Sequence, residues 1–493
     1  MKTKTNTRNL LPDSDYTCFV ITSLFSREEC EELLNNDIKN AFQKAISNYP
    51  TYYRNNDRWV VDDDTIANRL FEKVKPWLPA TIETNANIPS ENGVWRLKEL
   101  NNRLRFCKYS ANQYFHRHLD GIHYRAEHIQ SKLTFMIYLN SATEFEGGRT
   151  LFYKTKDTTE IWASYIPQQG DLIVFDHNVW HEGEVLTSGE KFVLRSDILY
   201  AKEPSPTPQQ PFSGHLGYIW ALQKFDNSTI LSGGRDKEIK VWSPSGEQIQ
   251  SLTGHDNSIL CIEKINSNTF ISGSRDRRII VWQRQHDGDF RLLTAIKVHS
   301  ATVLSLCRLT NTTFASAGGD NTVQVVNLDG QILTSLSAHS NWVWKVIKLQ
   351  EDIIATSSED GTIKIWNTAL KKLIQTFKEQ YPVLSLAYNE HNRQLISGNL
   401  PGEISIRTLT ANFTQQALKK YLAHNGIIRT IKWIDNNLVA TGGEDNKIKI
   451  WSIHNQELTR VLEHHNFVQS IELLENHQLL SASYDGTIKS WPL

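Results

Sequence analysis

The feature that most constrains this chain is a pattern of 40 to 44 residues that recurs from about residue 212 onward. Each strong unit begins with a histidine, runs through an apolar stretch and a Ser/Gly-rich stretch, and reaches an aspartate in a turn. The sixth residue after the aspartate is a tryptophan, except in the third unit, where it is Val326. A weaker unit at 381–409 has Pro401 and Arg407 in these two positions and brings the count to seven. The histidines are His215, His255, His299, His339, His424 and His464, the aspartates are Asp236, Asp276, Asp320, Asp360, Asp445 and Asp485, and the tryptophans are Trp242, Trp282, Trp366, Trp451 and Trp491.

Every unit reads as four short strands separated by turn residues, which is the spacing of one blade of a β-propeller. The last unit stops after its third strand, because the sequence ends at Leu493. The segment 204–213 ends as the fourth strands of the other units do. We therefore expect this segment to complete the seventh blade and close the ring, which removes exposed strand edges.

These units resemble the WD-repeat family over about 280 residues. The resemblance implies that the histidine, a strand serine or threonine, the turn aspartate and the tryptophan of one blade form a hydrogen-bonded set. It thus implies a structural role for these histidines rather than catalysis or metal binding. The fifth blade lacks the set and is expected to be the loosest.

A propeller of this kind usually binds, so a protein or peptide partner is expected on one rim. Aromatic and arginine side chains are the usual anchors of such contacts. The other interpretation is that Trp220 and Trp344 only pack between blades. The candidate contact residues are Tyr218, Trp220, Arg235, Arg275, Trp342 and Trp344.

The first half of the chain has no repeat and is expected to form a separate domain at 16–202, after a tail at 1–15 and before the propeller at 203–493. Ser26 and Glu29 form a capping box at the start of one helix, and a second helix fits 62–79. About eight strand-like segments follow, separated by glycine-containing turns. The predicted fold class is mainly β: a double-stranded β-helix (jelly-roll) barrel with flanking helices, followed by a seven-bladed propeller.

Three residues inside the predicted barrel have the pattern of an iron site. His118 and Asp120 in HRHLDG are two residues apart, so on a strand they leave the same face. His181 in VFDHNVWHEG follows about sixty residues later. Two histidines and one carboxylate on one side of Fe(II) form the facial triad of non-haem iron oxygenases, which leaves coordination positions open.

A cation downstream of the triad would suit a 2-oxoglutarate co-substrate, whose far carboxylate needs a partner in the barrel. Lys191 lies ten residues after His181, and Arg195 lies four residues further on the same face. Tyr138 and Tyr109 could add hydroxyl groups. Whether Lys191 or Arg195 dominates stays open, because Arg195 could equally be a structural ion-pair residue.

Residues 16–201 resemble the prolyl 4-hydroxylase-like branch of the Fe(II)/2-oxoglutarate dioxygenases, on the HxD pair, the distal histidine and the cation ten residues later. The resemblance implies that His118, Asp120 and His181 bind iron, that Lys191 holds the far carboxylate of 2-oxoglutarate, and that the reaction is a hydroxylation. Ascorbate is a candidate reductant. An intact Asp120 favours hydroxylation over the halogenation that related enzymes with a small residue there perform.

Two departures from the family stand out. One is the additional Arg195, and the other is the segment YYRNNDRW, which does not identify a substrate. In that segment Arg54, Asn55 and Arg58 either line the substrate entrance or are solvated residues beside a helix. His116 shares a face with His118 but lies outside the motif, and is expected to be a neighbour only.

Composition narrows the function further. The chain has 53 basic and 54 acidic residues, so no nucleic-acid partner is expected. No apolar run reaches the length of a membrane span, so no membrane partner is expected either. Five widely spaced cysteines argue against a disulfide framework and for a reducing, cytoplasmic location.

Three hypotheses follow. The first is a dioxygenase that hydroxylates a protein or peptide recruited by the propeller. The second is a dioxygenase acting on a small molecule, with the propeller as an assembly scaffold. The third is a scaffold whose first domain has lost catalysis, which the complete set of His118, Asp120, His181 and Lys191 argues against.

Overall fold

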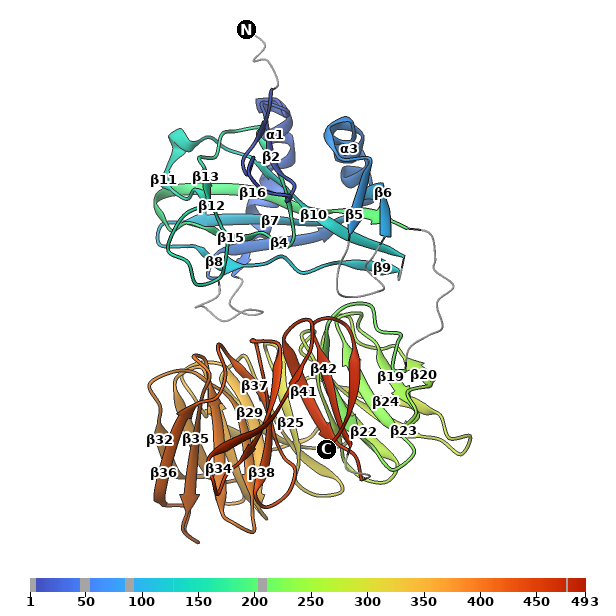
Figure 1. The fold of residues 1–493 in the computed structure, drawn as a ribbon, viewed down its shortest axis with the longest axis vertical. Helices are drawn as coiled ribbons and strands as arrows, with labels where there is room; N and C mark the ends of the chain where they lie inside the picture. The colour runs from blue at the N-terminus through green and yellow to red at the C-terminus, as the bar shows by residue number, and fades with distance from the viewer. Residues whose placement is uncertain (1–5, 45–53, 85–92, 127, 203–210, 476–477) are drawn as a thin grey trace. The chain divides into compact units, whose positions relative to one another are not determined.

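The computed structural model describes residues 6–44, 54–84, 93–126, 128–202, 211–475 and 478–493 (Figure 1). The chain divides into two compact units, Met1–Pro206 and Thr207–Leu493. Strands dominate both units, which confirms the predicted mainly β fold class.

The described part of the first unit contains two antiparallel sheets. The main sheet has the strand order β1-β2-β14-β10-β16-β7-β4-β3, with β5, β6, β9 and β11 paired at its sides. The small sheet has the order β13-β12-β15-β8. The main-sheet strands are β1 (Asn6–Asn9), β2 (Cys18–Thr22), β3 (Gln43–Lys44), β4 (Asp57–Asp62), β5 (Thr81–Thr84), β6 (Gly93–Leu100), β7 (Arg103–Ser110), β9 (Tyr124–Ala126), β10 (Ile129–Tyr138), β11 (Phe145–Gly147), β14 (Leu172–Asp176) and β16 (Leu186–Ala201). The small-sheet strands are β8 (Phe115–His118), β12 (Thr150–Tyr153), β13 (Ala163–Tyr165) and β15 (Trp180–Gly183).

The outer face of the main sheet is covered by helices. They are α1 (Arg27–Leu33), α2 (Asn36–Ala41) and α3 (Asp64–Val74), and short 3-10 turns lie at Lys75–Trp77 and Ala142–Glu144. Ser26 caps α1 and forms the predicted capping box with Glu29. Leu33 of α1 and Val74 of α3 pack in one core with Phe135 of β10, which places the helices against this face.

The inner face of the main sheet shares a second core with the small sheet. Because side chains alternate along a strand, Phe135 faces the helices while Tyr138 of the same strand lies in this second core. Phe152 of β12 and Phe115 of β8 reach the same core from the small sheet. The two sheets thus enclose the space in which the predicted site residues lie.

The N-terminal segment extends the main sheet. Residues 6–9, which the sequence assigns to a tail, form the edge strand β1 and pair with β2 from Asn6↔Thr22 to Asn9↔Phe19. All four of these residues are exposed. A polar strand is tolerated at a sheet edge because it has no core to cover, and for the same reason the apolar pattern did not reveal it.

Among its described residues, the second unit contains seven small antiparallel sheets in chain order, which are the blades. The first three are β17 (Ile219–Lys224), β18 (Ile230–Gly234), β19 (Ile239–Trp242), β20 (Gln248–Leu252); β21 (Ile259–Lys264), β22 (Thr269–Ser274), β23 (Ile279–Arg284), β24 (Phe290–Ile296); and β25 (Val303–Arg308), β26 (Thr313–Gly318), β27 (Val323–Asn327), β28 (Ile332–Leu336). The next two are β29 (Val343–Gln350), β30 (Ile353–Ser358), β31 (Thr362–Asn367), β32 (Lys372–Lys378); and β33 (Val383–Asn389), β34 (Gln394–Asn399), β35 (Glu403–Leu409), β36 (Gln415–Leu422). The last two are β37 (Ile428–Trp433), β38 (Leu438–Gly443), β39 (Lys447–Ser452), β40 (Glu457–Glu463); and β41 (Val468–Leu473), β42 (Gln478–Ser483), β43 (Ile488–Pro492).

The expected hydrogen-bonded set is complete in five of the blades, and the third blade has its histidine, aspartate and serine without the tryptophan. In the first blade His215 Nδ1 lies 2.9 Å from Asp236 Oδ2, and its Nε2 lies 2.7 Å from Ser232 Oγ. Trp242 Nε1 donates to the same hydroxyl at 2.7 Å. The same set recurs in the second, fourth, sixth and seventh blades. These histidines are therefore engaged within their blades.

The fifth blade replaces this set with a buried ion pair. Arg407 occupies the tryptophan position and donates to Ser397 Oγ at 3.2 Å and to the carboxylate of Glu379. Lys420 Nζ donates to the other oxygen of Glu379 at 2.6 Å. The side chains of Arg407 and Glu379 are only 2% and 1% exposed. A buried ion pair thus takes the place of the hydrogen-bonded set in the fifth blade. The expectation that this blade is the loosest did not include such an interaction.

The seventh sheet has three strands among the described residues, and β17 of the first blade shares a core with β42 and β43 of the seventh. Of the predicted closing strand 204–213, residues 204–210 lie outside the described residues. In the described end of this segment, the Phe212 N–H donates to the Gly246 carbonyl at 2.7 Å. The Phe212 ring lies 5.8 Å from the ring of Trp242. The closing strand stays a prediction.

Candidate metal centre

The three residues predicted to bind iron meet inside the barrel. His118 ends β8 and lies directly opposite His181 of β15, so the two imidazoles come from a cross-strand pair of the small sheet. Asp120 follows two residues after β8, and its N–H donates to the His177 carbonyl at 3.2 Å. His118 Nε2 is 3.4 Å from Asp120 Oδ1, and His181 Nε2 is 3.6 Å from Asp120 Oδ2. One ligand atom from each residue lies within 4.8 Å of the others, and all three residues are buried.

Backbone carbonyls orient both imidazoles. His118 Nδ1 lies 2.7 Å from the His116 carbonyl, and His181 Nδ1 lies 3.0 Å from the Val179 carbonyl. A protonated Nδ1 donates to each carbonyl, which leaves the lone pair of Nε2 toward Asp120. Burial lowers the pKa of both histidines, and that of His181 falls to about 3. Both rings are thus neutral at pH 7, the form that binds a metal.

Two donors hold the Asp120 carboxylate. Arg195 donates through Nη2 to Oδ1, and Thr134 donates through its hydroxyl to Oδ2. Burial alone would raise the pKa of Asp120, but the Arg195 guanidinium holds it well below its usual range. Two neutral imidazoles and one ionised carboxylate are the donor set of the Fe(II) facial triad, so these residues fit that ion. The sequence pattern did not reveal Thr134, because its approach to Asp120 depends on the fold.

Lys191 lies on the inner face of the main sheet, opposite Tyr109 of β7. It is 3% exposed, and its Nζ donates to the Gly148 carbonyl at 2.6 Å and lies 4.6 Å from the centre of the Tyr109 ring. Burial lowers the pKa of Lys191 to about 8 and raises that of Tyr109 to about 12. A buried cation whose present partner is a neutral carbonyl is suited to a carboxylate ligand.

Tyr138 comes from the adjacent strand β10, opposite Val193 of β16, and shares this inner face. Its hydroxyl forms a hydrogen bond of 2.6 Å with Thr150 Oγ1, and burial raises its pKa. Lys191, Tyr109 and Tyr138 thus come from three neighbouring strands. Gly148 and Thr150, which contact Lys191 and Tyr138, were not identified from the sequence because both belong to segments without a cofactor motif.

Arg195 lies apart from Lys191 although both leave the same face of β16. Four residues of strand separate their Cα atoms by about 13 Å. The Arg195 guanidinium reaches Asp120, and Arg105, directly opposite on β7, donates to Asp197 at 2.9 Å. The structure therefore places Arg195 at the metal-binding carboxylate.

The candidate partner residues of the propeller form two clusters. Tyr218 stacks on Tyr484 with ring centres 4.2 Å apart, and Trp220 lies 4.7 Å from the same ring. The guanidinium of Arg235 lies 4.9 Å from the Tyr218 ring, and that of Arg275 lies 5.2 Å from the Trp220 ring.

The second cluster contains Trp342 and Trp344, whose rings are 5.4 Å apart. Trp344 Nε1 donates to Glu359 Oε2 at 2.6 Å. Trp342 is 3% exposed, and its ring meets Gly319 of the preceding blade. Trp342 is therefore a packing residue between blades rather than an exposed anchor.

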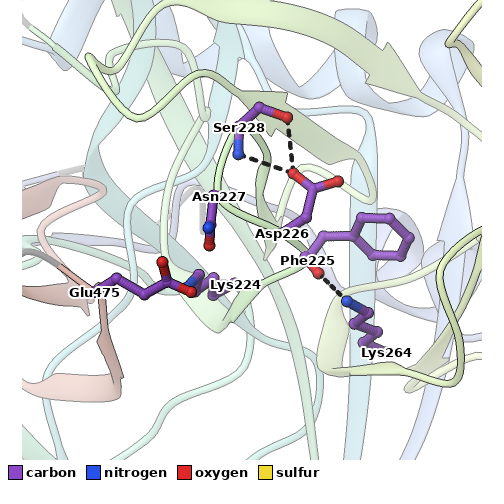
Figure 2. Close-up of a pocket in the computed structure, with 7 residues that line it drawn as sticks. All are labelled: Lys224, Phe225, Asp226, Asn227, Ser228, Lys264 and Glu475. Atoms are coloured by element: carbon purple, nitrogen blue, oxygen red, sulfur yellow. Dashed lines mark hydrogen bonds and ion pairs between the residues drawn. The ribbon is translucent and has the colours of Figure 1, made fainter.

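A pocket on the propeller opens among seven residues (Figure 2). Its two lysines already have partners: Lys224 pairs with Glu475 at 2.9 Å, and Lys264 donates to the Phe225 carbonyl. Asp226 accepts from Ser228. These polar groups of the pocket thus have partners within the propeller. The lining residues are Lys224, Phe225, Asp226, Asn227, Ser228, Lys264 and Glu475.

Comparison with known families agrees with both halves. Residues 104–196 match the family model of the 2OG-Fe(II) oxygenase superfamily. Residues 206–243 and 246–283 match that of the WD domain, G-beta repeat, and residues 291–482 match one described as Vps42 beta-propeller. The chain therefore carries a 2OG-Fe(II) oxygenase domain followed by WD repeats in a propeller.

Curated relatives match only short stretches. The 66 kDa stress protein of Physarum polycephalum is 32% identical over 15% of this chain and 12% of its own length. The ribosome biogenesis protein YTM1 of Saccharomyces cerevisiae is 27% identical, and that of Vanderwaltozyma polyspora 29%, each over 17% of both chains. The match thus spans less than a fifth of any of these relatives. Within the described residues, no helix is long and apolar enough to cross a membrane.

Proposed function

We propose that the first unit is an Fe(II)- and 2-oxoglutarate-dependent hydroxylase of the prolyl 4-hydroxylase-like branch, and that its substrate is a protein or peptide recruited by the propeller. The observation that carries the proposal is the arrangement of the inner face. His118, Asp120 and His181 meet with their ligand atoms within 4.8 Å, and Lys191 is buried on the adjoining sheet. Family models for an oxygenase and for WD repeats support the two parts.

The chain's own residues set up the chemistry. Fe(II) with 2-oxoglutarate supplies the oxidation of a C–H bond by dioxygen, with succinate and carbon dioxide as the other products. His118, His181 and Asp120 hold the metal, and Arg195 and Thr134 keep Asp120 ionised and oriented. An intact carboxylate at Asp120 favours hydroxylation. Ascorbate is proposed as a reductant that keeps the iron ferrous.

Lys191 holds the far carboxylate of 2-oxoglutarate by charge, with the Tyr109 and Tyr138 hydroxyls beside it. Its present contact with the Gly148 carbonyl costs little to exchange, because a carboxylate is a stronger acceptor than a neutral carbonyl. Around this region, Phe115 stacks on His118 and Phe175 lies edge-on to His181. These rings exclude water from the ligand atoms and strengthen the electrostatic interactions there.

The propeller is proposed to bring the substrate to the barrel. The cluster of Tyr218, Trp220, Arg235 and Arg275 combines aromatic rings with guanidinium groups, the residue types that dominate binding to proteins. We further propose a cytoplasmic location, since all five cysteines are free. A small-molecule substrate, with the propeller as a scaffold, is the second candidate, favoured by the buried cations of the barrel.

The test of this function has two stages. Purified full-length protein should give the visible absorption of a 2-oxoacid chelated to Fe(II) under argon, and should form succinate after oxygen is admitted. The unreactive analogue N-oxalylglycine should then hold the protein in a complex for capture of its substrate from a cell lysate. Mass spectrometry of the captured peptide, after turnover, should find one added oxygen atom. A captured protein that never gains oxygen contradicts the proposed substrate class.

A further inference from the structure

The first strands of the seven blades encircle the axis of the propeller. Each contacts the first strand of the next blade, and β41 of the last blade contacts β17 of the first. In every blade the pairing of the first strand with the second skips one residue, as between Ile219 and Ala221 in the first blade and between Val343 and Lys345 in the fourth. The skipped residues hold equivalent positions, so they form a ring at the end of the propeller that carries the turn aspartates.

Four consecutive members of this ring are apolar or aromatic. They come from the second to the fifth blade and are Leu260, Leu304, Trp344 and Leu384. Leu384 is buried, and the other three keep part of their surface exposed. We call these four residues the apolar arc.

One acid, Glu359, is hydrogen-bonded to the tryptophan of the apolar arc. Its N–H donates to the Trp342 carbonyl at 2.9 Å, and Trp344 Nε1 donates to its Oε2 at 2.6 Å. Only 8% of Glu359 is exposed. Its other oxygen, Oε1, has no hydrogen bond among the described residues and is not one of the buried atoms that lack a partner, so it stays open to solvent.

The Glu359 carboxylate forms no ion pair with any described residue. Arg429 of the sixth blade acts on it electrostatically, but the Arg429 guanidinium is held by Glu444 of its own blade at 2.5 Å. Burial prevails and, with a smaller contribution from Asp360, raises the pKa of Glu359 to about 7. Ionisation of a buried carboxylate is unfavourable unless a cation compensates the charge.

We propose that the protein or peptide bound by the propeller lays a lysine or arginine side chain along the apolar arc, with its charged end at Glu359 Oε1. The inference rests on the proposed role of the propeller, because it names the chemistry of the partner that the propeller recruits. A basic side chain matches each part of the site. Its methylene stem covers the leucines, its charge is attracted to the face of the indole ring, and its N–H groups donate to the carboxylate.

Other side chains fit this site less well. A neutral apolar side chain would cover the arc and leave the Glu359 carboxylate without a cation. An acidic side chain would be repelled by the same carboxylate. The charge of the anchoring residue is therefore the property to test.

The test measures binding of short, blocked alanine-based peptides to the full-length protein without iron or 2-oxoglutarate. The peptides differ only in the central residue, which is lysine, arginine, norleucine or glutamate. Norleucine keeps the methylene stem and lacks the charge. Calorimetry should show a lysine or arginine peptide binding at least about tenfold more tightly than the norleucine peptide, the value of one charge-assisted hydrogen bond.

Three results would overturn the inference. The first is equal affinity for the lysine, arginine and norleucine peptides. The second is no measurable binding of any of the four peptides. The third is binding of n-butylamine as tightly as the basic peptides, because the occupant would then be a free amine rather than a side chain of a partner.

Variants make the test specific. Glu359→Gln keeps the size of the side chain and an oxygen that can accept from Trp344, but it removes the charge, so the preference for the basic peptides should disappear. Glu359→Asp should retain part of the preference. The control is Glu457→Gln, which removes an exposed glutamate of the outermost strand β40 and should bind as the wild type does. An unchanged preference in Glu359→Gln, or an equal loss in Glu457→Gln, contradicts the proposal.

Stability separates a role in binding from a role in folding. Because burial disfavours the charged carboxylate of Glu359, Glu359→Gln at pH 8 should unfold at the same urea concentration as the wild type or at a higher one. A variant that is as stable as the wild type and has lost the charge preference assigns Glu359 to the partner. A lower urea midpoint together with the lost preference would assign it to folding and overturn the inference.

The two proposals fail in different ways, since the peptide measurement does not involve the metal. Absence of the Fe(II)–2-oxoglutarate absorption in the wild-type protein contradicts the proposed hydroxylase. A normal absorption together with peptides that bind regardless of charge contradicts only the basic anchor.

Discussion

Lys191 and Arg195 leave the same face of β16 but bind different partners: Lys191 donates to the Gly148 carbonyl, and Arg195 donates to the carboxylate of Asp120. The first cation lies over the ring of Tyr109, and the second lies at the proposed iron ligand. Substitution of Lys191 is therefore expected to weaken 2-oxoglutarate binding, and substitution of Arg195 is expected to weaken metal binding. This difference separates the two roles that the sequence left open.

Lys191→Ala should weaken 2-oxoglutarate binding while Fe(II) stays bound. Loss of the partner of a buried carboxylate costs about 2–5 kcal/mol, so the KM for 2-oxoglutarate should rise at least about 30-fold. The measurement is succinate formation against 2-oxoglutarate concentration, with iron content measured in parallel. The control is Lys108→Ala, which removes a lysine paired with Glu190. A KM that changes equally in both variants would remove Lys191 from the co-substrate site.

The affinity for 2-oxoglutarate should fall as the pH rises above 8. Burial lowers the pKa of Lys191 to about 8, so its ammonium group is present below that pH and is lost above it. Because the dianion binds the protonated lysine, the dissociation constant should increase by up to about tenfold per pH unit above 8. Calorimetric titrations between pH 7 and 9.5 measure this slope, and Lys191→Ala should abolish it. An unchanged constant across the range contradicts the assignment.

Arg195→Met should act on the metal rather than on 2-oxoglutarate. It removes the main charged donor to Asp120, and loss of such an outer partner typically costs about 10–100-fold in metal affinity. Fe(II) or Mn(II) affinity and the KM for 2-oxoglutarate should be measured on the same protein. Arg195→Lys restores a charge with less precise geometry and should recover part of the metal affinity. A large rise in KM with normal metal affinity would reverse the roles of Arg195 and Lys191.

Residues with a fixed spacing were the ones that could be predicted. The seven blades follow from a repeat in the sequence, and the meeting of His118, Asp120 and His181 follows from a short motif and a distal histidine. The partners of these residues could not be predicted, because they depend on strand register: Thr134 reaches Asp120 only through the pairing of β10 with its neighbours. Trp342 looked like an exposed anchor, yet the adjacent blade covers it.

Charge was also hard to interpret from the sequence. Arg54 and Arg58 were as consistent with solvated residues as with a substrate entrance, and the structure turns both toward Cys107. Similarly, Arg407 read as a missing tryptophan, whereas its partner Glu379 lies 28 residues earlier, at the position that precedes the histidine in the other units. A long-range ion pair leaves no local signal in one sequence.

Arg407→Ala should destabilise the propeller. It leaves the buried carboxylate of Glu379 with Lys420 as its remaining cation, and loss of one partner of a buried pair costs about 3–5 kcal/mol. Urea unfolding of the full chain, followed by tryptophan fluorescence, measures the propeller transition. The apolar pair Arg407→Met with Glu379→Leu should recover most of the loss, since no buried charge is left unpaired and Lys420, which is partly exposed, keeps Glu403. A wild-type transition in Arg407→Ala would show that the fifth blade does not depend on this pair.

The most direct measurement of the central claim compares two histidines on one strand. His118→Ala and His116→Ala are matched, because the residues are two apart on β8 and His116 contributes only its backbone carbonyl to the His118 ring. Under argon, Fe(II) and 2-oxoglutarate should give the chelate absorption in the wild type and in His116→Ala, and after oxygen is admitted both should form succinate. His118→Ala should give neither signal, because two ligands rarely hold the metal. Equal absorption and succinate formation in His118→Ala would contradict the iron centre and the oxygenase function built on it.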